Sequence, residues 1–300
     1  MRRLTINLLL LVIVLAAEHA SALDCVKLAP SETHVEDAGY SRGLLWRIES
    51  VEGRVNHLFG TIHISDPRVT DLSPIVTEVL MSSDSFGMEV LLDVEAMLQM
   101  SKAMYYGAGQ SLDQNLEPGL FERTVELLGE YGVSLEAARN LKPWAAYTTL
   151  SLPPGKTAMP LDLLLLRVAR QGGKEVFGLE SIGEQVAVFD GLAISDQTEL
   201  LEQAVCHYGE FQSEIEKMIG HYVSRDLSAM MRMSMRYRSP LNDRFLDVVL
   251  WQRNRRMAER MLPHLQKGGA FIAVGALHLP GVDGVLDLLV KRGYDVQPID

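Results

Sequence analysis

The amino-acid sequence predicts an α/β fold in which helices flank a mixed central β-sheet and a helical segment is inserted as a cap. Strand-like and helix-like patterns alternate at both ends of the chain, whereas the middle is mostly helical in pattern. The 300 residues are 47% hydrophobic and 22% charged, which is ordinary for a globular protein and unlike a disordered chain or a coiled coil. No linker rich in Pro, Gly or Ser interrupts residues 23–300, so we expect them to form one domain.

The first 22 residues have the pattern of a secretory signal peptide. Arg2 and Arg3 precede an apolar run over residues 8–17, and the small-x-small pattern of residues 20–22 marks a cleavage site. The run is shorter than the roughly 20 apolar residues that usually span a membrane, and no second long apolar run follows. We therefore expect cleavage after Ala22 and a periplasmic or secreted mature chain without a stable membrane span. The alternative is an uncleaved N-terminal anchor.

The mature chain would carry two cysteines, Cys25 and Cys206, into an oxidising compartment. They could pair and tie the mature N-terminus to the body of the protein, or they could stay apart. Their spacing is not that of a zinc site, and neither has the local signature of a nucleophile.

The fold is expected to open with a β-hairpin. Residues 44–49 and 55–62 are apolar, β-rich runs, and the short polar interval between them contains Gly53. Ser73 and Pro74 then supply an N-cap and a first-turn proline for a helix. That helix is expected to end near residue 82, and a strand is expected over residues 85–91.

The middle of the chain has the apolar spacing of helices, and the end returns to alternating elements. Gly172 and Gly173 end one helix and precede a short apolar strand. The Met-rich stretch over residues 218–235 is either a core-facing helix with a solvated basic face or the wall of a mobile groove. The expected helices cover residues 94–106, 118–131, 135–141, 161–171, 181–189, 197–219, 241–265 and 282–292, and the expected strands cover 174–179, 270–274 and 294–298.

The charge balance restricts the partners of the protein. The chain has 28 Lys and Arg against 39 Asp and Glu, a formal net charge of −11. Nucleic-acid binding needs a surplus of basic side chains on one face. We therefore expect a peptide or small-molecule substrate and no nucleic-acid partner, and the sequence leaves the oligomeric state open.

Two strand ends share the pattern Gly-x-x-His, namely Gly60 to His63 and Gly275 to His278. A glycine at the end of a strand permits close backbone approach and can bring the following imidazole to the rim of the sheet. In open α/β sheets, ligands bind at that rim. The two histidines are therefore candidate site residues and the two glycines are candidate structural residues. The alternative is a pair of rim histidines with structural hydrogen bonds.

Two glutamates belong to apolar strands. Glu89 is embedded in one of them, and because an unpaired buried carboxylate is costly, it should either face solvent at the end of the strand or meet a cation. Two imidazoles and one carboxylate form the ligand set of a catalytic divalent metal with an open position for water, so His63, Glu89 and His278 are the candidate metal ligands. Glu180 is either a further ligand, a general base or an ordinary charge at a strand end.

A basic run occurs inside the long helical pattern near the C-terminus. Arg253 could bind a substrate carboxylate or stabilise an oxyanion, and Asn254 could orient a ligand. A basic run on a helix usually forms a solvated face, and we expect this for Arg255 and Arg256.

These motifs together resemble the TraB/GumN group, which belongs to the superfamily that contains the Tiki proteases and is distantly similar to erythromycin esterase and ChaN. The likeness covers nearly the whole mature chain from about Leu44. It is carried by Gly60–His63, Glu89, residues 142–144, Leu161-Asp162, residues 178–185, Arg253-Asn254 and residues 275–281.

The resemblance implies an erythromycin esterase- and ChaN-like α/β fold and a metal-dependent hydrolase, since Tiki members act as Mn²⁺- or Co²⁺-dependent proteases. His63, Glu89 and His278 fall on the family's metal and catalytic positions. Glu180 falls on its second glutamate. The positions of its Arg-Asn pair are occupied by Arg253 and Asn254.

The preferred hypothesis is a periplasmic or secreted metallohydrolase, a peptidase that uses metal-activated water. The first alternative is a metal-independent, esterase-type hydrolase with His63 or His278 as general base. The second alternative is a non-enzymatic protein that binds a metal or another ligand. No His-Glu-x-x-His helix is present, so the chain is not an ordinary zincin.

Overall fold

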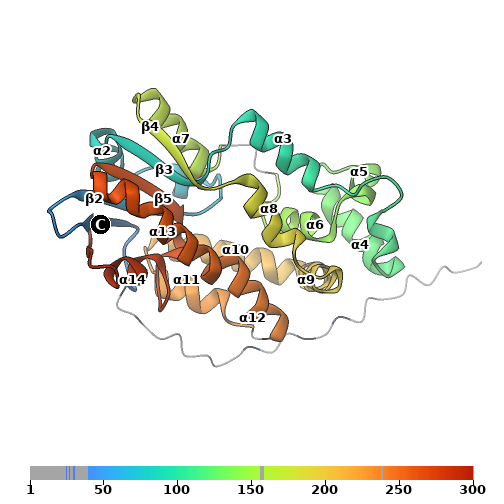
Figure 1. Ribbon diagram of the computed structural model, residues 1–300. Helices are drawn as coiled ribbons and strands as arrows, with labels where there is room; N and C mark the ends of the chain where they lie inside the picture. Colours follow the sequence, from blue (N-terminus) through green and yellow to red (C-terminus); the bar gives the residue numbers. More distant parts are fainter. Residues whose placement is uncertain are drawn as a thin grey trace, which may run out of the picture.

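The computed structural model describes residues 25, 27, 30, 40–155, 159–237 and 239–299. A six-stranded sheet forms one end of the molecule and a group of helices forms the other, as Figure 1 shows. The signal peptide predicted over residues 1–22 lies outside the described residues, so it stays a prediction. The assignment of residues 23–300 to one domain also stays a prediction.

The strands lie in the order β4-β3-β5-β2-β1-β6. Four of them, β2 to β5, run parallel, and β1 is antiparallel to both of its neighbours. The predicted mixed α/β sheet and the opening hairpin are therefore confirmed. The bounds are β1 Leu45–Glu49, β2 Val55–Thr61, β3 Ser85–Val90, β4 Glu175–Glu180, β5 Ala270–Gly275 and β6 Asp295–Pro298.

The helices that flank the sheet begin with α1 Pro67–Thr70 and α2 Pro74–Ser82, and α7 Leu161–Gln171 has the predicted bounds. The inserted helices form the predicted cap. They are α3 Val94–Ala103, η1 Leu112–Gln114, α4 Pro118–Gly129, α5 Leu135–Asn140, α6 Pro143–Leu150, α8 Ile182–Asp190 and α9 Ile194–Cys206. The later helices are α10 Tyr208–Val223, α11 Leu227–Ser234, α12 Pro240–Leu246, the π-helical η2 Asp247–Trp251, α13 Gln252–Lys267, η3 Ala276–His278 and α14 Val285–Val290.

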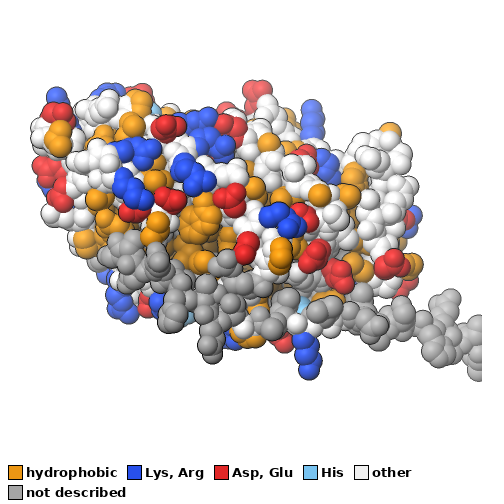
Figure 2. Space-filling view, turned by 60° about the horizontal axis from the view of Figure 1, so that its bottom comes forward, with side chains coloured by type: hydrophobic (Ala, Val, Ile, Leu, Met, Phe, Trp, Pro, Cys, Tyr) orange, Lys and Arg blue, Asp and Glu red, His pale blue; other side chains and the backbone are white. Residues whose placement is uncertain are grey.

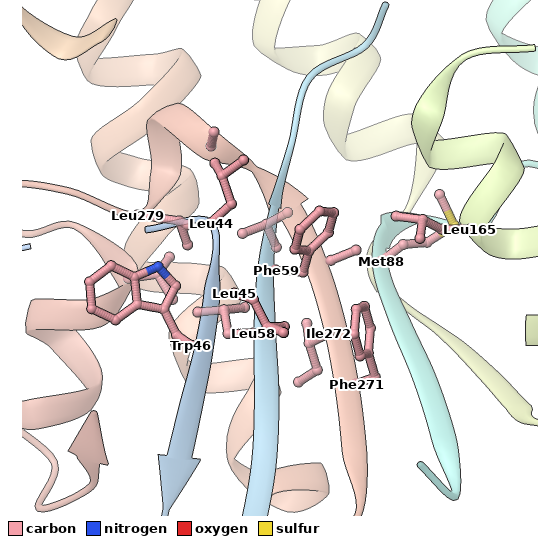
Figure 3. Packing of buried hydrophobic residues seen from close by; sticks show 14 of the residues in the cluster. Leu44, Leu45, Trp46, Leu58, Phe59, Met88, Leu165, Phe271, Ile272 and Leu279 are labelled. Atoms are coloured by element: carbon pink, nitrogen blue, oxygen red, sulfur yellow. The ribbon is translucent and has the colours of Figure 1, made fainter. Parts of the chain in front are cut away.

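At the centre of the sheet, side chains of β5 pack against those of both neighbouring strands, β2 and β3. The Phe271 ring lies 6.0 Å from that of Phe59 on β2 and 6.1 Å from that of Phe86 on β3. Leu58 and Ile272, the neighbours of Phe59 and Phe271 along β2 and β5, pack on the opposite face of the sheet, and both are almost fully buried (Figure 3). Each such side chain contributes about 1.5–3 kcal/mol by its burial. This packing fixes the ends of the parallel strands, where the candidate site residues lie.

The cap has a second apolar core of its own, which includes Leu112, Leu128, Trp144 and Leu201. Cys206, the last residue of α9, forms a disulfide with Cys25, and their Cα atoms are 5.5 Å apart. The pairing that the sequence left open is therefore made, and it ties the segment at Cys25 to the cap.

Two of the predicted helices differ from their expected bounds. Residues 197–219 form two helices, α9 and α10, because the chain turns at His207. The turn lets α9 bury Leu201 in the core of the cap while α10 buries Tyr222 in the core of the sheet. The last helix is shorter than residues 282–292, because Asp283 has a left-handed backbone with φ 60° and α14 begins only after it.

The helix α6 was not predicted. It buries Trp144, Ala145 and Ala146 together, so it lacks the one-sided apolar pattern that reveals a surface helix. The Met-rich segment faces both the core and a cavity. Met230 and Met231 of α11 are buried, and Met230 and Met233 line the cavity. That this wall is mobile stays a prediction.

The surface carries charges of both signs close together. On the face shown in Figure 2, Lys and Arg side chains alternate with Asp and Glu. Ion pairs between partly exposed side chains include that of Arg260 with Glu184. Among the described helices, none combines the length and the apolar character that a membrane crossing requires.

Candidate functional site

An open cavity of about 530 Å³ lies where the sheet meets the helices. Its wall on the sheet side includes His63, which follows β2, and Gly275 and His278 at the end of β5. Arg253 enters from α13. The carboxyl ends of β2 and β5 meet because these strands are parallel neighbours, which brings together two histidines that are far apart in the sequence.

The first histidine is held by a buried acid. The Nδ1 atom of His63 lies 2.8 Å from Oδ2 of Asp162, at the start of α7, and Oδ1 of Asp162 accepts a hydrogen bond from Thr61. Asp162 raises the pKa of His63 to about 9. The ring itself lies in the cavity with 62% of its side chain exposed, so Nε2 is free to meet a ligand.

The second histidine is held by an amide. The Nδ1 atom of His278 lies 2.6 Å from Oδ1 of Asn254, and the Asn254 Nδ2 group donates to the carbonyl of Asp283. Because its amide nitrogen is used in this way, the Asn254 oxygen accepts from His278, which places the imidazole proton on Nδ1. Burial lowers the pKa of His278 to about 4, so the ring is neutral at pH 7.

Glu89, the penultimate residue of β3, lies between these groups. One oxygen accepts the backbone N–H of Gly275 at 2.6 Å and lies 3.6 Å from Nε2 of His278, and the other accepts from Arg253 at 2.5 Å. Burial by itself would raise the pKa of Glu89, but its contacts with His278, Arg253 and Gly275 lower that pKa by more. The carboxylate therefore stays ionised, and the cation that it meets is Arg253.

Glu180 ends β4 and anchors the arginines of α13. Its side chain is fully buried, and one oxygen accepts from Arg253 at 2.7 Å while the other accepts from Arg256 at 2.8 Å. Gln185 lies near the first oxygen at 3.4 Å. This arrangement fits a residue that positions Arg253. The role of Glu180 as a general base stays a prediction, since both of its oxygens are already engaged.

The two glycines of the histidine motifs allow close contacts. A Cβ atom at Gly60 would lie 2.8 Å from the side chain of Leu279 and 3.2 Å from the backbone of Ala276. At Gly275 it would lie 3.2 Å from the Glu89 carboxylate. A side chain at either position would push apart the segments that carry the histidines.

The donor set fits a divalent metal in part. Both histidines bind a neighbour through Nδ1 and leave Nε2 available, which is the usual arrangement of metal ligands. Two ligands of one ion lie about 3.0–3.5 Å apart, close to the separation of His278 Nε2 and Glu89 Oε1. In the described part of the chain, no three His, Cys, Asp or Glu side chains form a ready-made metal cluster. The metal role of His63, Glu89 and His278 therefore stays a prediction.

Sequence reasoning missed the supporting residues. Asp162 appeared only as part of a family pattern, although it is the partner of His63. Arg256 was expected on a solvated face, which is wrong, because it binds the buried Glu180. The signal available was the spacing of Arg253, Arg256 and Arg260, which puts the three on one helix face. Arg255, off that face, is half exposed as predicted.

Comparison with known proteins identifies several similar chains. Metalloprotease TIKI2 of Danio rerio is 25% identical over 299 residues, which cover 81% of this chain and 58% of that protein. Metalloprotease TIKI1 of Danio rerio is 26% identical, covering 84% and 62%. A metalloprotease TIKI homolog of Amphimedon queenslandica is 25% identical, covering 90% and 64%. The chain thus spans less than two thirds of the length of these relatives.

No solved structure matches the chain, so the predicted likeness to the folds of erythromycin esterase and ChaN stays a prediction. A sequence model of the TraB/PrgY/gumN family matches residues 44–298, which include every candidate site residue. The resemblance predicted from the motifs is confirmed. The chain therefore belongs to the TraB/PrgY/gumN family.

Proposed function

We propose that this protein is a hydrolase that cleaves peptide bonds at the cavity between the sheet and the helices. The observation that carries the proposal is the meeting of His63 and His278 in one cavity, each with Nδ1 held and Nε2 available. The relatives that are named metalloproteases support the reaction class.

Arg253 would contact the developing charge of the reaction. Its Nε and Nη2 groups bind the two glutamates, and Nη1 donates to the carbonyl of Val249. Among the described residues, one Nη1–H remains for a substrate oxygen. A guanidinium fixed on several sides needs little reorganisation when an oxyanion forms, which is the condition for electrostatic catalysis.

A divalent ion, Mn²⁺ or Co²⁺, would be held by Nε2 of His63, Nε2 of His278 and the nearer oxygen of Glu89. When bound, such an ion supplies a Lewis acid and lowers the pKa of its water. Asn254 would keep His278 in the tautomer that binds through Nε2, and Asp162 would orient His63. Glu180 would hold Arg253 in place.

The test is a peptide-library assay on protein that has been stripped with a chelator and resupplied with Mn²⁺ or Co²⁺. Hydrolysis should be lost on stripping and restored by metal. His63→Ala should lower turnover more than about 100-fold, because even residues that only support a metal ligand are worth about 10–100-fold. His57→Ala is the matched control, since His57 lies on β2 away from the cavity lining. Full metal-stimulated turnover in His63→Ala would exclude this proposal.

A second candidate is a metal-independent hydrolase, which the ion pair of His63 with Asp162 favours. The pKa of His63 is raised to about 9 and that of His278 is lowered to about 4. Two groups whose pKa values are driven apart suit an acid and a base, so His63 would donate a proton and His278 would accept one. Chelation separates the candidates, because only the first loses activity. Metal binding without any hydrolysis would instead favour a binding protein.

We also infer that the protein acts in the periplasm or outside the cell. The disulfide between Cys25 and Cys206 suits an oxidising compartment. The N-terminal pattern of the sequence points the same way. Fractionation of cells that express the tagged chain tests the inference, and a tag confined to the cytoplasm would contradict it.

A further inference from the structure

The cavity extends beyond the histidines along α10. At the sheet end of this helix, the Tyr222 hydroxyl donates to the carbonyl of Gly60, and at the cap end Gln212 donates to the carbonyl of Leu150. These two anchors are ten residues apart, so α10 bridges roughly 15 Å between the sheet and the cap. The cavity wall follows the same helix from Met218 to Phe211.

The wall along this path is mostly apolar. It is built from large side chains of α10, α11 and α12, of which α10 and α11 pack against each other. Its methionines can adapt to different neighbours. The principal apolar residues are Ile215, Met218, Met230, Met233, Phe245 and Leu246.

We propose that this apolar part of the cavity is a subsite for a substrate segment of several residues with large apolar side chains. The proposal rests on the proposed function for the bond that is cleaved. The subsite opens directly onto His63 and His278, since all of these residues line one cavity. A segment bound along α10 would therefore be held beside the reacting groups.

The polar groups in the same wall favour a peptide over a fatty-acyl chain. Asn242 donates its amide N–H to the Tyr237 carbonyl, and Gln203 donates to Glu199. Among the described residues, this leaves both side-chain amide oxygens able to accept from a peptide N–H. An acyl chain would leave those oxygens desolvated and unpaired, which is unfavourable.

Glu214, the less exposed of the two acids in the wall, is already engaged, which argues against a basic side chain at its position. It accepts from Arg236 at 3.3 Å and from the Tyr237 hydroxyl at 3.2 Å. Glu210 lies 3.6 Å from His207, and 75% of its side chain is exposed to solvent. A lysine beside Glu214 would have to displace Arg236 and Tyr237, whereas an apolar side chain would not.

The test is equilibrium binding by fluorescence anisotropy to the wild-type protein. The probes are three labelled hexapeptide amides, one of leucine, phenylalanine and valine, one of serine and asparagine, and one rich in lysine. The apolar probe should bind at least about tenfold more tightly than either of the others, since one buried apolar side chain already supplies that factor. Mass spectrometry checks that each probe stays intact during the measurement.

Met233→Glu should weaken binding of the apolar probe about tenfold, because it places a charge in the apolar wall. The matched control is Met97→Glu on α3, where the side chain is exposed and does not line the cavity, and its binding should be unchanged. Ile215→Ser is a milder second variant, and circular dichroism establishes that each variant is folded.

Equal binding of the three probes, or an unchanged preference in folded Met233→Glu and Ile215→Ser, would overturn the subsite. Tighter binding of oleate than of the apolar probe would do the same, by assigning the cavity to an acyl chain. Hydrolysis of peptides without any apolar preference would overturn the subsite and leave the proposed function standing. A preference for the apolar probe without hydrolysis of any peptide would support the subsite and overturn the proposed function.

Discussion

The rim at the carboxyl ends of the parallel strands, which we call the sheet edge, and the apolar wall formed by α10, α11 and α12 line one cavity but are built by different interactions. At the sheet edge, buried charges hold one another, with 12% of the Arg253 side chain and none of Glu180 exposed. On the helical side, apolar side chains such as Met233 and Phe245 form the wall. Fixed charges suit chemistry because their geometry barely changes, whereas an adaptable apolar wall suits the recognition of varied side chains.

Removing the buried anchor of the sheet edge should have the largest effect. Glu180→Ala leaves Arg253 and Arg256 without their shared carboxylate, and breaking a buried pair typically costs about 3–5 kcal/mol. Urea unfolding of the wild type and the variant measures the loss in the free energy of unfolding. The control on the same strand is Glu175→Ala, whose exposed pair with Lys267 is worth about 1 kcal/mol or less. Equal losses in the two variants would mean that the sheet edge does not depend on its buried charges.

Removing the covalent tie of the cap should have the next largest effect. Cys25→Ser/Cys206→Ser deletes a cross-link between residues 181 positions apart, and such losses typically cost about 2–4 kcal/mol. Urea unfolding without reductant measures the change, and reduced wild-type protein should match the double variant. A loss below about 1 kcal/mol would show that the apolar core of the cap is sufficient without the tie.

A change in the support of His63 should have a smaller effect, confined to the sheet edge. Under the proposed metal chemistry, Asp162→Asn should lower the affinity for Co²⁺ about 10–100-fold, because the ring loses the group that orients it. Calorimetric titration measures the affinity directly. Thr61→Val, which removes only the hydrogen bond to Asp162, should lower it less. If Asp162→Asn bound Co²⁺ as tightly as the wild type, Asp162 would have no part in supporting the metal site.

The smallest effect is expected at a partly exposed pair beside the buried network. Hydrogen bonds from Arg260 and from the backbone of Ser181 lower the pKa of Glu184 to about 2. Its stabilisation is therefore complete above its unfolded pKa of about 4.3 and is lost as the pH falls toward 2.

Glu184→Gln should cost about 1 kcal/mol or less at pH 6, because solvent screens the pair, and the difference from wild type should shrink between pH 4 and pH 3. Unfolding at these pH values measures it. If the difference in free energy of unfolding between the wild type and Glu184→Gln grew as the pH fell, the prediction would be wrong.

Local patterns were sufficient for most elements of the fold. Residues 161–171 form the predicted helix, because its apolar spacing and the following glycines are local signals. The helix α6 and the break at His207 escaped prediction for a common reason. Burial on all sides removes the periodic pattern of α6, and a division between two cores decides where α9 ends.

The candidate site shows the same limit. The sequence indicated His63, Glu89 and His278 because strand ends with unusual polar residues are visible in one dimension. It could not show that Asp162 holds His63 or that Glu180 joins Arg253 to Arg256, since these pairs join separate elements. A basic run on a helix has the same spacing whether it faces water or a buried acid.

The sequence by itself determined the α/β class, most strands and helices, and the residue types of the site, because periodicity and strand-end motifs are encoded locally. Only the tertiary structure decided which charges meet, that Cys25 pairs with Cys206, and that an apolar wall continues from the histidines. Electrostatic pairing and cavity shape depend on distances across the fold, and the sequence does not contain those distances until the parallel strands and the helices pack.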